Sequence, residues 1–508
     1  MKLQRPKLID LLTVLLLAAL SAAAQDVASF EKRITVKKLE NGLTVLICER
    51  PEAPVFSYFT HVDVGAVQEV PGITGLAHMF EHMAFKGTDK IGTKDYAKEK
   101  AALEKVEQAF AAYDRERLKR VGRDDAKVKE LEKAWKDAIA EANQYALPDE
   151  FEEIIEREGG VGVNAFTNWD ETGYFYSLPV NRLELWAYLE SERYLHPVMR
   201  EFYKERDVVF EERRMRTDSQ PVGRLVEQFL AAAFTAHGYH RPVVGYASDL
   251  MSFSATDAEE FRRKYYVPAN MVVAVVGDVK AAEALPIIEK YFGRLPNTPK
   301  PEPVRTQEPP QNAERTVILR DQAQPFYLEG YHRPDVLDPD DVVYDAISDI
   351  LSKGRTSRLY RSLVRDKKIA VAAAGFSPFP GAKYPHLFAF FAVPTPGHTN
   401  QECADAIHQE IERLKTEDVS DEELQSVKTR AKADLIRQLD SNQGLALQLA
   451  TFERRFGDWR ELFRQVERIE KVSKADIRRV ANAVFRDTNR TVGMIETVKP
   501  AAAPKGGQ

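Results

Sequence analysis

Two histidines and a glutamate lie close together in the segment GLAHMFEHMAFKGT, residues 75–88. The segment is rich in helix formers and has no β-branched residue before its final threonine, so His78 and His82 are expected one turn apart on one helix face. Both imidazoles can then reach one metal ion, with Glu81 beside it as a general base for a zinc-bound water. This is the inverted form of the HExxH zinc motif. A bare H-x-x-E-H string also arises by chance, and two histidines on an ordinary helix are the alternative.

A catalytic zinc site needs a third protein ligand. The best candidates are the acidic residues of YKERDVVFEERRMRTD, residues 203–218, another segment expected to be helical. Glu205 and Glu212 are seven residues apart, which places them two turns apart on one face of a helix. This spacing suits one carboxylate on the metal and one behind it that orients a histidine. The alternative is a solvated charged surface, in which Glu211 and its neighbours have no special role.

The elements that must position these residues fall into two parts. A proline-rich polar stretch, residues 296–310, is the clearest linker, and a capped helix, a turn and an apolar strand close each part, at 253–279 and 471–498. We predict an internal duplication of one α/β unit, although common α/β patterning also produces such similarity. The expected units are a first domain over 25–295, a linker over 296–313, a second domain over 314–498 and a flexible tail over 499–508.

One segment does not belong to the duplicated pattern. Between about Asp95 and Tyr145 the chain is charged and helix-forming, and its apolar residues recur at alternating steps of three and four. The pattern breaks at VGRDD, residues 121–125, which predicts an antiparallel helical hairpin inserted into the first domain. A solvated spacer and a partner-binding arm are both compatible with this composition.

The overall composition excludes several classes of protein. The chain has 508 residues, of which 44% are hydrophobic and 30% charged, so a disordered or fibrous protein is not expected. A formal net charge of -6 without a basic stripe argues against nucleic-acid binding. Cys48 and Cys403 lie far apart, and we expect two buried thiols rather than a disulfide framework.

The first 24 residues have the layout of a cleavable secretory signal peptide. Basic residues precede an apolar run from Leu8 to Leu20, and the small residues 22–24 follow it, so cleavage is expected before Gln25. An uncleaved anchor is the alternative, but the run is short for a bilayer crossing. We therefore expect a periplasmic or secreted protein without a membrane span after signal cleavage.

Three ordered motifs resemble the pitrilysin/insulinase family of inverted-motif zinc metallopeptidases, which includes the mitochondrial processing peptidase and bacterial processing-peptidase-like members. They are residues 75–88, GGVGVNAFTNWDETGYFYSLP at 159–179 and ERDVVFEERR at 205–214. The resemblance extends over nearly the whole mature chain, including HGYHRPVVG at 237–245 and GRTSRLYRSLVRD at 354–366. Three motifs in this order are far more specific than one.

The resemblance implies one zinc ion per chain and a role for each candidate residue. In the family's ER-x-x-V-x-x-E arrangement the final glutamate binds the metal, which favours Glu212 over the competing Glu211. The separation of His82 from Glu212 is roughly fifty residues longer than the family usually has, and the predicted hairpin accounts for this excess. Carried over residue by residue, the pattern makes His78, His82 and Glu212 the zinc ligands, Glu81 the base and Glu205 the supporting acid.

The resemblance also implies how a peptide substrate is held. In the family an edge strand after the glycine pair adds the peptide as an extra β-strand, and GVNAFT at 162–167 occupies that place, with Asn164 and Ala165 as expected contacts. An ordinary edge strand is the alternative. Active members usually carry an arginine and a tyrosine in the second half, seven residues apart, that contact the substrate and help at the oxyanion. Arg365 fits the arginine, but Ala372 stands in the tyrosine position.

The implied fold is α/β (α+β), with two homologous domains, each a mainly antiparallel sheet backed by helices, forming a clamshell around a cavity. The predicted function is that of a zinc metalloendopeptidase acting on peptides or unfolded protein segments. Because of Ala372, the chain either takes an Arg/Tyr-bearing partner subunit in a heterodimer, or works as a homodimer or monomer with another residue at the oxyanion.

Two other functions compete with this prediction. A non-catalytic scaffold or assembly subunit of the same family typically loses metal ligands or the base, whereas all four residues are present in this chain. A metal-dependent hydrolase of non-peptide substrates has no evident use for a strand that pairs with peptides.

Overall fold

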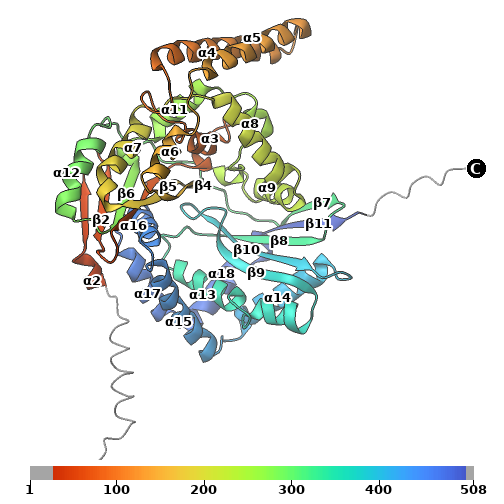
Figure 1. Ribbon diagram of the computed structural model, residues 1–508. Helices are drawn as coiled ribbons and strands as arrows, with labels where there is room; N and C mark the ends of the chain where they lie inside the picture. Colours follow the sequence, from red (N-terminus) through yellow and green to blue (C-terminus); the bar gives the residue numbers. More distant parts are fainter. Residues whose placement is uncertain (1–26, 499–508) are drawn as a thin grey trace, which may run out of the picture.

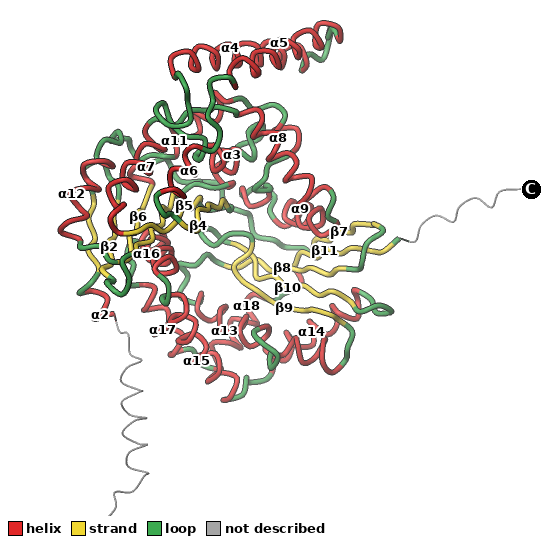
Figure 2. The backbone as a smooth tube through the Cα atoms, in the orientation of Figure 1, coloured by secondary structure: helices red, strands yellow, loops and turns green. Residues whose placement is uncertain are grey.

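The computed structural model describes residues 27–498 (Figure 1). The expected signal peptide over residues 1–24 and the expected tail over 499–508 lie outside the described residues. Within them, two β-sheets backed by helices occupy separate halves of the molecule, which confirms the expected α/β fold (Figure 2). Cys48 and Cys403 are both buried free thiols, as expected.

The first sheet has six strands and is antiparallel except for one parallel pair, β2 with β6. Successive side chains of a strand point to opposite faces, so Val45 and Ile47 enter one apolar cluster while Leu46 and Cys48 enter another. In the order of the sheet, the strands are β1 (Ile34–Lys38), β2 (Thr44–Glu49), β6 (Met271–Gly277), β3 (Val55–Val62), β5 (Thr172–Pro179) and β4 (Val161–Thr167).

The second sheet has five strands, and its parallel pair is β7 with β11. In sheet order the strands are β7 (Arg315–Asp321), β11 (Arg490–Thr497), β8 (Phe326–Arg333), β10 (His386–Pro394) and β9 (Ala370–Phe379). Strand for strand this order repeats β2-β6-β3-β5-β4 of the first sheet, including the place of the parallel pair. A shared topology of this kind is what duplication of one α/β unit produces.

Helices pack on both sheets. In the first part they are α2 (Val27–Glu31), α3 (Leu76–Met83), α6 (Glu150–Arg157), α7 (Leu183–Leu195), α8 (Phe202–Arg213), α10 (Ala247–Leu250), α11 (Ala255–Tyr265) and α12 (Ala281–Phe292). In the second part they are α13 (Asp341–Ser352), α14 (Asn400–Thr416), α15 (Asp421–Gln438), α17 (Glu461–Lys471) and α18 (Lys474–Val484). The largest apolar cluster joins α3, α7, α11 and α12 to the first sheet, and a second cluster joins α13, α14 and α18 to the second.

Each part also lends one helix to the sheet of the other part. Helix α9 (Pro221–Ala233) packs Leu225 and Phe229 in one apolar cluster with Leu328 and Ile495 of the second sheet. Helix α16 (Asn442–Phe456) packs its leucines against the first sheet, on the face opposite α3. As a result, two apolar clusters contain residues from both halves.

Two long helices, α4 (Tyr96–Arg117) and α5 (Asp125–Asn143), form a hairpin that projects from the first half (Figure 1). Asp124 begins α5 by accepting a hydrogen bond from the main-chain N–H of Ala126 at 2.9 Å. The two helices are held together by ring stacking of Tyr113 on Trp135, with centroids 5.3 Å apart. Phe110 and Trp135 also belong to the largest apolar cluster, so the base of the hairpin is packed into the core of the first half.

An ion cluster around the buried carboxylate of Asp63 joins the two halves. The carboxylate of Asp63, directly after β3, contacts Lys383 from the β9–β10 loop and Arg454 from α16, and Lys300 of the linker lies 3.5 Å away. Burial alone would raise the pKa of Asp63, but Lys383 and Arg454 outweigh it and hold this pKa well below its usual value. The charged form of Asp63 is therefore stabilised by folding.

We expect Asp63→Asn to lower the free energy of unfolding by roughly 1.5–3 kcal/mol, because the partly buried Lys383 and Arg454 lose a buried charged partner. A group whose folded pKa is depressed stabilises the protein above its unfolded pKa of about 4, and this contribution is lost as the pH falls. Urea unfolding should therefore show a smaller difference in the free energy of unfolding between Asp63→Asn and the unaltered protein at pH 3 than at pH 7. Asp137→Asn, which breaks an exposed ion pair with Lys133, is the control, and equal losses in both variants would contradict the assignment.

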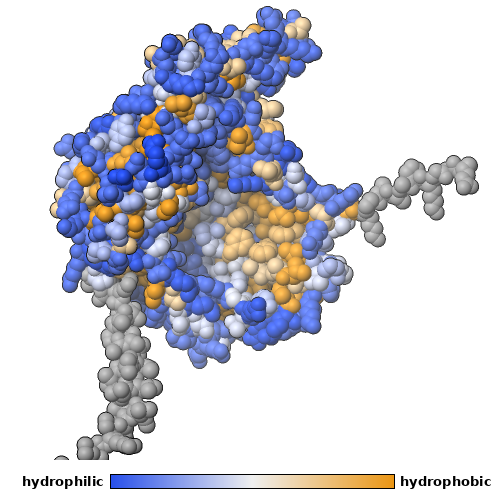
Figure 3. Space-filling view, viewed as in Figure 1, coloured by the Kyte–Doolittle hydropathy of each residue, from blue (hydrophilic) through white to orange (hydrophobic). Residues whose placement is uncertain are grey.

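The two halves face each other across a hollow (Figure 3). Hydrophobic side chains gather in this hollow over β8, β9 and β10 (Figure 3). The half-buried rings of Phe326 on β8 and Phe391 on β10 stack with centroids 5.9 Å apart. Among the helices of residues 27–498, none combines the length and apolar character that a membrane span requires.

Candidate metal centre

The start of α3 is fixed by a buried carboxylate. Glu69 accepts hydrogen bonds at 2.8 Å from the main-chain N–H groups of Gly75 and Ala77, which are free donors at a helix N-terminus. Gly75 has φ +94°, and a Cβ there would lie 2.8 Å from the carbonyl oxygen of Val244. The tight glycine turn therefore sets where α3 begins, and hence where its histidines point.

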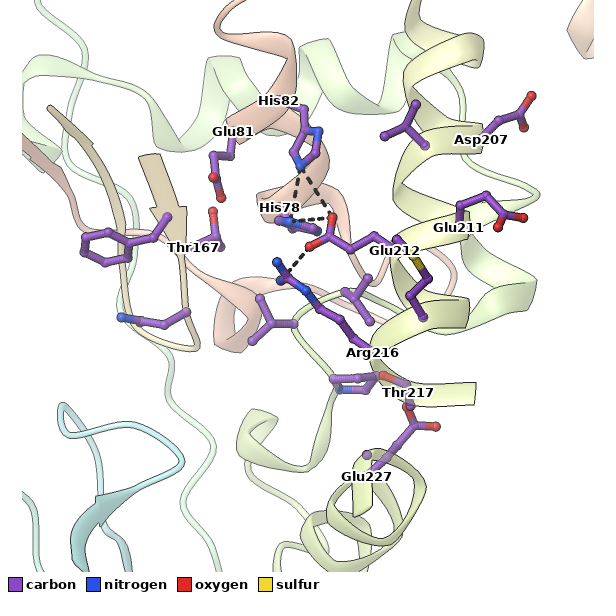
Figure 4. Close-up of a pocket in the computed structure, with 18 of the residues that line it drawn as sticks. His78, Glu81, His82, Thr167, Asp207, Glu211, Glu212, Arg216, Thr217 and Glu227 are labelled. Carbon is purple, nitrogen blue, oxygen red and sulfur yellow. Dashed lines mark hydrogen bonds and ion pairs between the residues drawn. The ribbon is translucent and has the colours of Figure 1, made fainter. Parts of the chain in front are cut away.

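Three ligand atoms converge at the inner face of α3 (Figure 4). The Nε2 atoms of His78 and His82 are 3.3 Å apart, and Oε2 of Glu212 on α8 lies 3.5 Å from the first and 3.7 Å from the second. Tetrahedral zinc with bonds of about 2.0–2.1 Å separates neighbouring ligand atoms by about 3.3–3.4 Å. The spacing and chemistry of these three side chains therefore fit a zinc ion.

The two histidines differ in what makes them suited to bind a metal ion. Burial lowers the pKa of His78 to about 3, which keeps the ring neutral, as a metal ligand must be. His82 is instead oriented through its other ring nitrogen, since Nδ1 lies 2.8 Å from Oε1 of Glu205. Burial alone would raise the pKa of Glu205, but His82 and Lys86, whose Nζ lies 2.8 Å from Oε2, lower it to about 2. Glu205 is therefore a carboxylate that fixes the ring of His82.

Glu81 points to the side of the three ligand atoms, toward β4 (Figure 4). Its Oε2 atom is buried and has no hydrogen-bond partner among the described residues. Burial raises the pKa of Glu81, and a hydrogen bond from Thr167 only partly opposes this shift. A carboxylate with a raised pKa and a free oxygen can accept and return a proton.

The edge strand β4 lies beside Glu81. It ends the first sheet, pairs with β5, and has a register irregularity between Val161 and Asn164. The side chain of Asn164 accepts a hydrogen bond at 2.9 Å from the main-chain N–H of Ala165. Asn164 and Ala165 both line the cavity next to the ligand atoms, so the strand offers an accessible peptide edge there.

A cavity of about 1580 Å³ opens from the ligand atoms. Its walls come from α3, β4, α8, α9 and the hairpin helix α5. Three exposed apolar residues line it, Val208 on α8, Met215 in the turn after α8 and Val222 at the start of α9, which gives the cavity an apolar part of its wall. A space of this size admits an extended peptide rather than a folded protein.

Not all the residues predicted from the sequence meet at this cavity. Glu211 lies on the same cavity wall as Glu212, but its carboxylate is directed to Arg214 at 2.7 Å. Arg365 is exposed, pairs with Asp366 and does not line the cavity. Ala372 on β9 does not line it either.

Sequence reasoning missed several residues that support the site. Arg216 holds Oε1 of Glu212 at 2.5 Å, which leaves Oε2 directed to the histidines. The spacing of Arg216, one turn after Glu212, was a usable signal for this ion pair. Glu69 and Thr167 carried no such signal, because their contacts depend on how separate segments pack.

Comparison with known proteins relates the chain to one group of peptidases. The family model described as "Insulinase (Peptidase family M16)" matches residues 44–119, and that described as "Peptidase M16 inactive domain" matches residues 252–431. The second region contains none of His78, His82 and Glu212. Among curated relatives, "Zinc protease PqqE" of Helicobacter pylori is 29% identical over 490 residues, covering 94% of this chain and 96% of that protein.

Other relatives extend the same likeness. A "Probable mitochondrial-processing peptidase subunit beta" of Arabidopsis thaliana is 23% identical over 491 residues, covering 92% of this chain and 79% of that protein. The crystal structure of a protease from Helicobacter pylori matches with a TM-score of 0.76 and 27% identity, covering 91% of this chain and 99% of that one. The periplasmic protease PqqL of Escherichia coli shares the fold, with a TM-score of 0.68 and 19% identity, over 92% of this chain and 48% of that one.

Proposed function

Because the chain belongs to the pitrilysin/insulinase family of zinc metallopeptidases (peptidase family M16), we propose that it is a zinc metalloendopeptidase that hydrolyses peptides or unfolded protein segments. The observation that carries the proposal is the convergence of His78, His82 and Glu212 at zinc-ligand spacing, with Glu81 beside them. One zinc ion per chain would be held by these three side chains. Bound zinc lowers the pKa of a coordinated water and polarises the carbonyl of the scissile bond.

Glu81 is the proton carrier in this proposal. Its raised pKa and free buried oxygen suit the acceptance of a proton from the attacking water and its return to the leaving amine. Thr167 restrains the other side of the carboxylate. Glu205 and Arg216 hold His82 and Glu212 in place, so that neither ligand has to be ordered when substrate arrives.

The edge of β4 positions the substrate. A peptide in extended conformation would pair with the main chain near Asn164 and Ala165, with the scissile bond next to the ligand atoms. Main-chain pairing of this kind recognises extended chains and tolerates varied side chains. Folded proteins have few free extended segments, which is why we propose peptides and unfolded segments as substrates.

A second candidate is the catalytic half of a two-subunit peptidase. It is favoured by the place of Arg365, which lies outside the cavity, and by alanine at position 372. In this version a related subunit, or a second copy of the chain, supplies the arginine and tyrosine that help at the oxyanion. A non-catalytic scaffold fits less well, because such a subunit has no need of a complete ligand set with its base.

We also propose that the protein is exported and acts in the periplasm or outside the cell. The basic, apolar and small-residue order of residues 1–24 supports export. One structural relative, PqqL of Escherichia coli, is a periplasmic protease, which is compatible with this location.

The test is hydrolysis of a mixed pool of short unstructured peptides by the purified chain without residues 1–24, with zinc determined on the same sample. We expect about one zinc per chain, cleavage, loss of cleavage after chelation and recovery when zinc is added back, because both the water and the carbonyl depend on the metal. Zinc binding without cleavage would favour the two-subunit version, in which a partner restores activity. Cleavage that survives complete metal removal would overturn the proposal.

A further inference from the structure

The helical hairpin and the metal centre share one cavity. Trp135, Lys136 and Ile139 of α5 line the same space as His78 and Glu212. The hairpin is therefore more than an arm projecting into solvent, since one of its faces forms a wall of the proposed substrate cavity.

This wall is fixed to the helix that carries Glu205 and Glu212. The hydroxyl of Tyr203 on α8 donates a hydrogen bond at 2.7 Å to Glu107 of α4, and its ring meets that of Trp135 edge-on, with centroids 5.0 Å apart. The guanidinium of Arg206, also on α8, lies over the rings of Phe110 and Trp135 at 5.1 and 5.6 Å. These buried contacts hold the hairpin at a set position relative to the metal ligands.

The distance along α8 between its contact with the hairpin and its metal ligand corresponds to a few residues of an extended peptide. Tyr203 precedes Glu212 by about nine positions on α8, which corresponds to about 13 Å along a helix axis. An extended peptide covers this length in about four residues. A substrate that runs from the metal ligands along α8 would therefore reach the hairpin wall about four residues from the scissile bond.

We propose that the inner face of the hairpin is a remote specificity subsite, in which Lys136 favours an acidic side chain about four residues from the scissile bond. The inference rests on the proposed peptidase function. Ile139 and the exposed Val208 are apolar residues that line the same cavity as Lys136. Lys136 is 64% exposed and forms one surface pair, with Glu132 at 2.6 Å, so it keeps donors for a substrate carboxylate.

The chain offers a matched control on the same helix. Lys133 is 77% exposed and also forms one 2.6 Å pair, with Asp137, but it does not line the cavity. Lys136→Glu and Lys133→Glu therefore make the same change of charge one turn apart on α5, but only Lys136 lines the cavity. A general effect of charge or of hairpin stability should appear in both variants.

The experiment compares two peptides that differ only in Glu or Lys at one position, scanned from one to six residues on both sides of a common cleavage site. Both peptides compete in one reaction, so the ratio of their kcat/KM values does not depend on the fraction of active enzyme. At about four residues from the bond we expect the unaltered protein to favour Glu, and Lys136→Glu to shift the ratio roughly 3–10-fold toward Lys, as for exposed charge pairs. Lys133→Glu should leave the ratio as it is.

Binding is measured in parallel as the Kd of the same labelled peptides by fluorescence anisotropy, which does not need hydrolysis. Should no peptide be cleaved, the proposal that the chain is a peptidase without a partner subunit fails, while the Kd ratios still test the hairpin. A shift confined to Lys136→Glu, in kcat/KM or in Kd, supports the subsite. Equal shifts in both variants, no shift in either, or a shift at all positions of the scan would overturn it.

Discussion

Replacing Glu81 with Gln is expected to lower kcat for peptide hydrolysis by roughly 10²–10⁴-fold, the range that a positioned general acid–base contributes. The amide matches the carboxylate in shape but cannot take the proton of the attacking water. Glu81 stands outside the three converging ligand atoms, so zinc content should stay near that of the unaltered protein. Kinetics on one cleaved peptide and zinc analysis of the same preparations check both expectations.

Glu211→Gln is the matched control for this change, because it removes a carboxylate from the same cavity but at a place turned away from the histidines. Its kcat should stay within a few-fold of the unaltered protein, as expected for a surface substitution away from the reacting groups. A Glu81→Gln protein that keeps full activity would remove Glu81 from its role. One that loses zinc would make Glu81 a ligand instead of a base.

The duplicated α/β unit could be predicted from the sequence because it rests on local patterns. The segments at 253–279 and 471–498 each contain a serine-capped helix followed by an apolar strand, and the structure places both strands, β6 and β11, at the same position of their sheets. Local propensity and periodicity are sufficient for such elements because the same residues that form the element also bury it.

The exchange of helices α9 and α16 could not be predicted in this way. An amphipathic helix shows that it has an apolar face, but not which of two similar sheets the face packs against. The same limit applies to Asp63, whose partners Lys383 and Arg454 lie far along the chain. Such contacts depend on the packing of whole halves.

Part of the candidate site could also be predicted from the sequence, and part of it depends on how separate helices pack. The spacing of His78 and His82 lies within one helix, so their shared face follows from helical geometry. The third ligand lies on a different helix, and two adjacent glutamates there differ by about 100° around the helix axis. Which one faces α3 depends on how α8 rotates against it, and the structure turns Glu212 toward the histidines and Glu211 toward Arg214.

We therefore expect Glu212→Ala to weaken zinc binding far more than Glu211→Ala. Loss of partners that only support metal ligands typically costs about 10–100-fold in affinity, so loss of a ligand should exceed roughly 100-fold. Glu211→Ala breaks an exposed pair with Arg214 and should change the affinity little. Titration against a chelator of known affinity measures both variants without relying on peptide hydrolysis. The reverse ranking would place Glu211 on the metal and would require α8 to turn about its axis from the position in which Glu205 contacts His82.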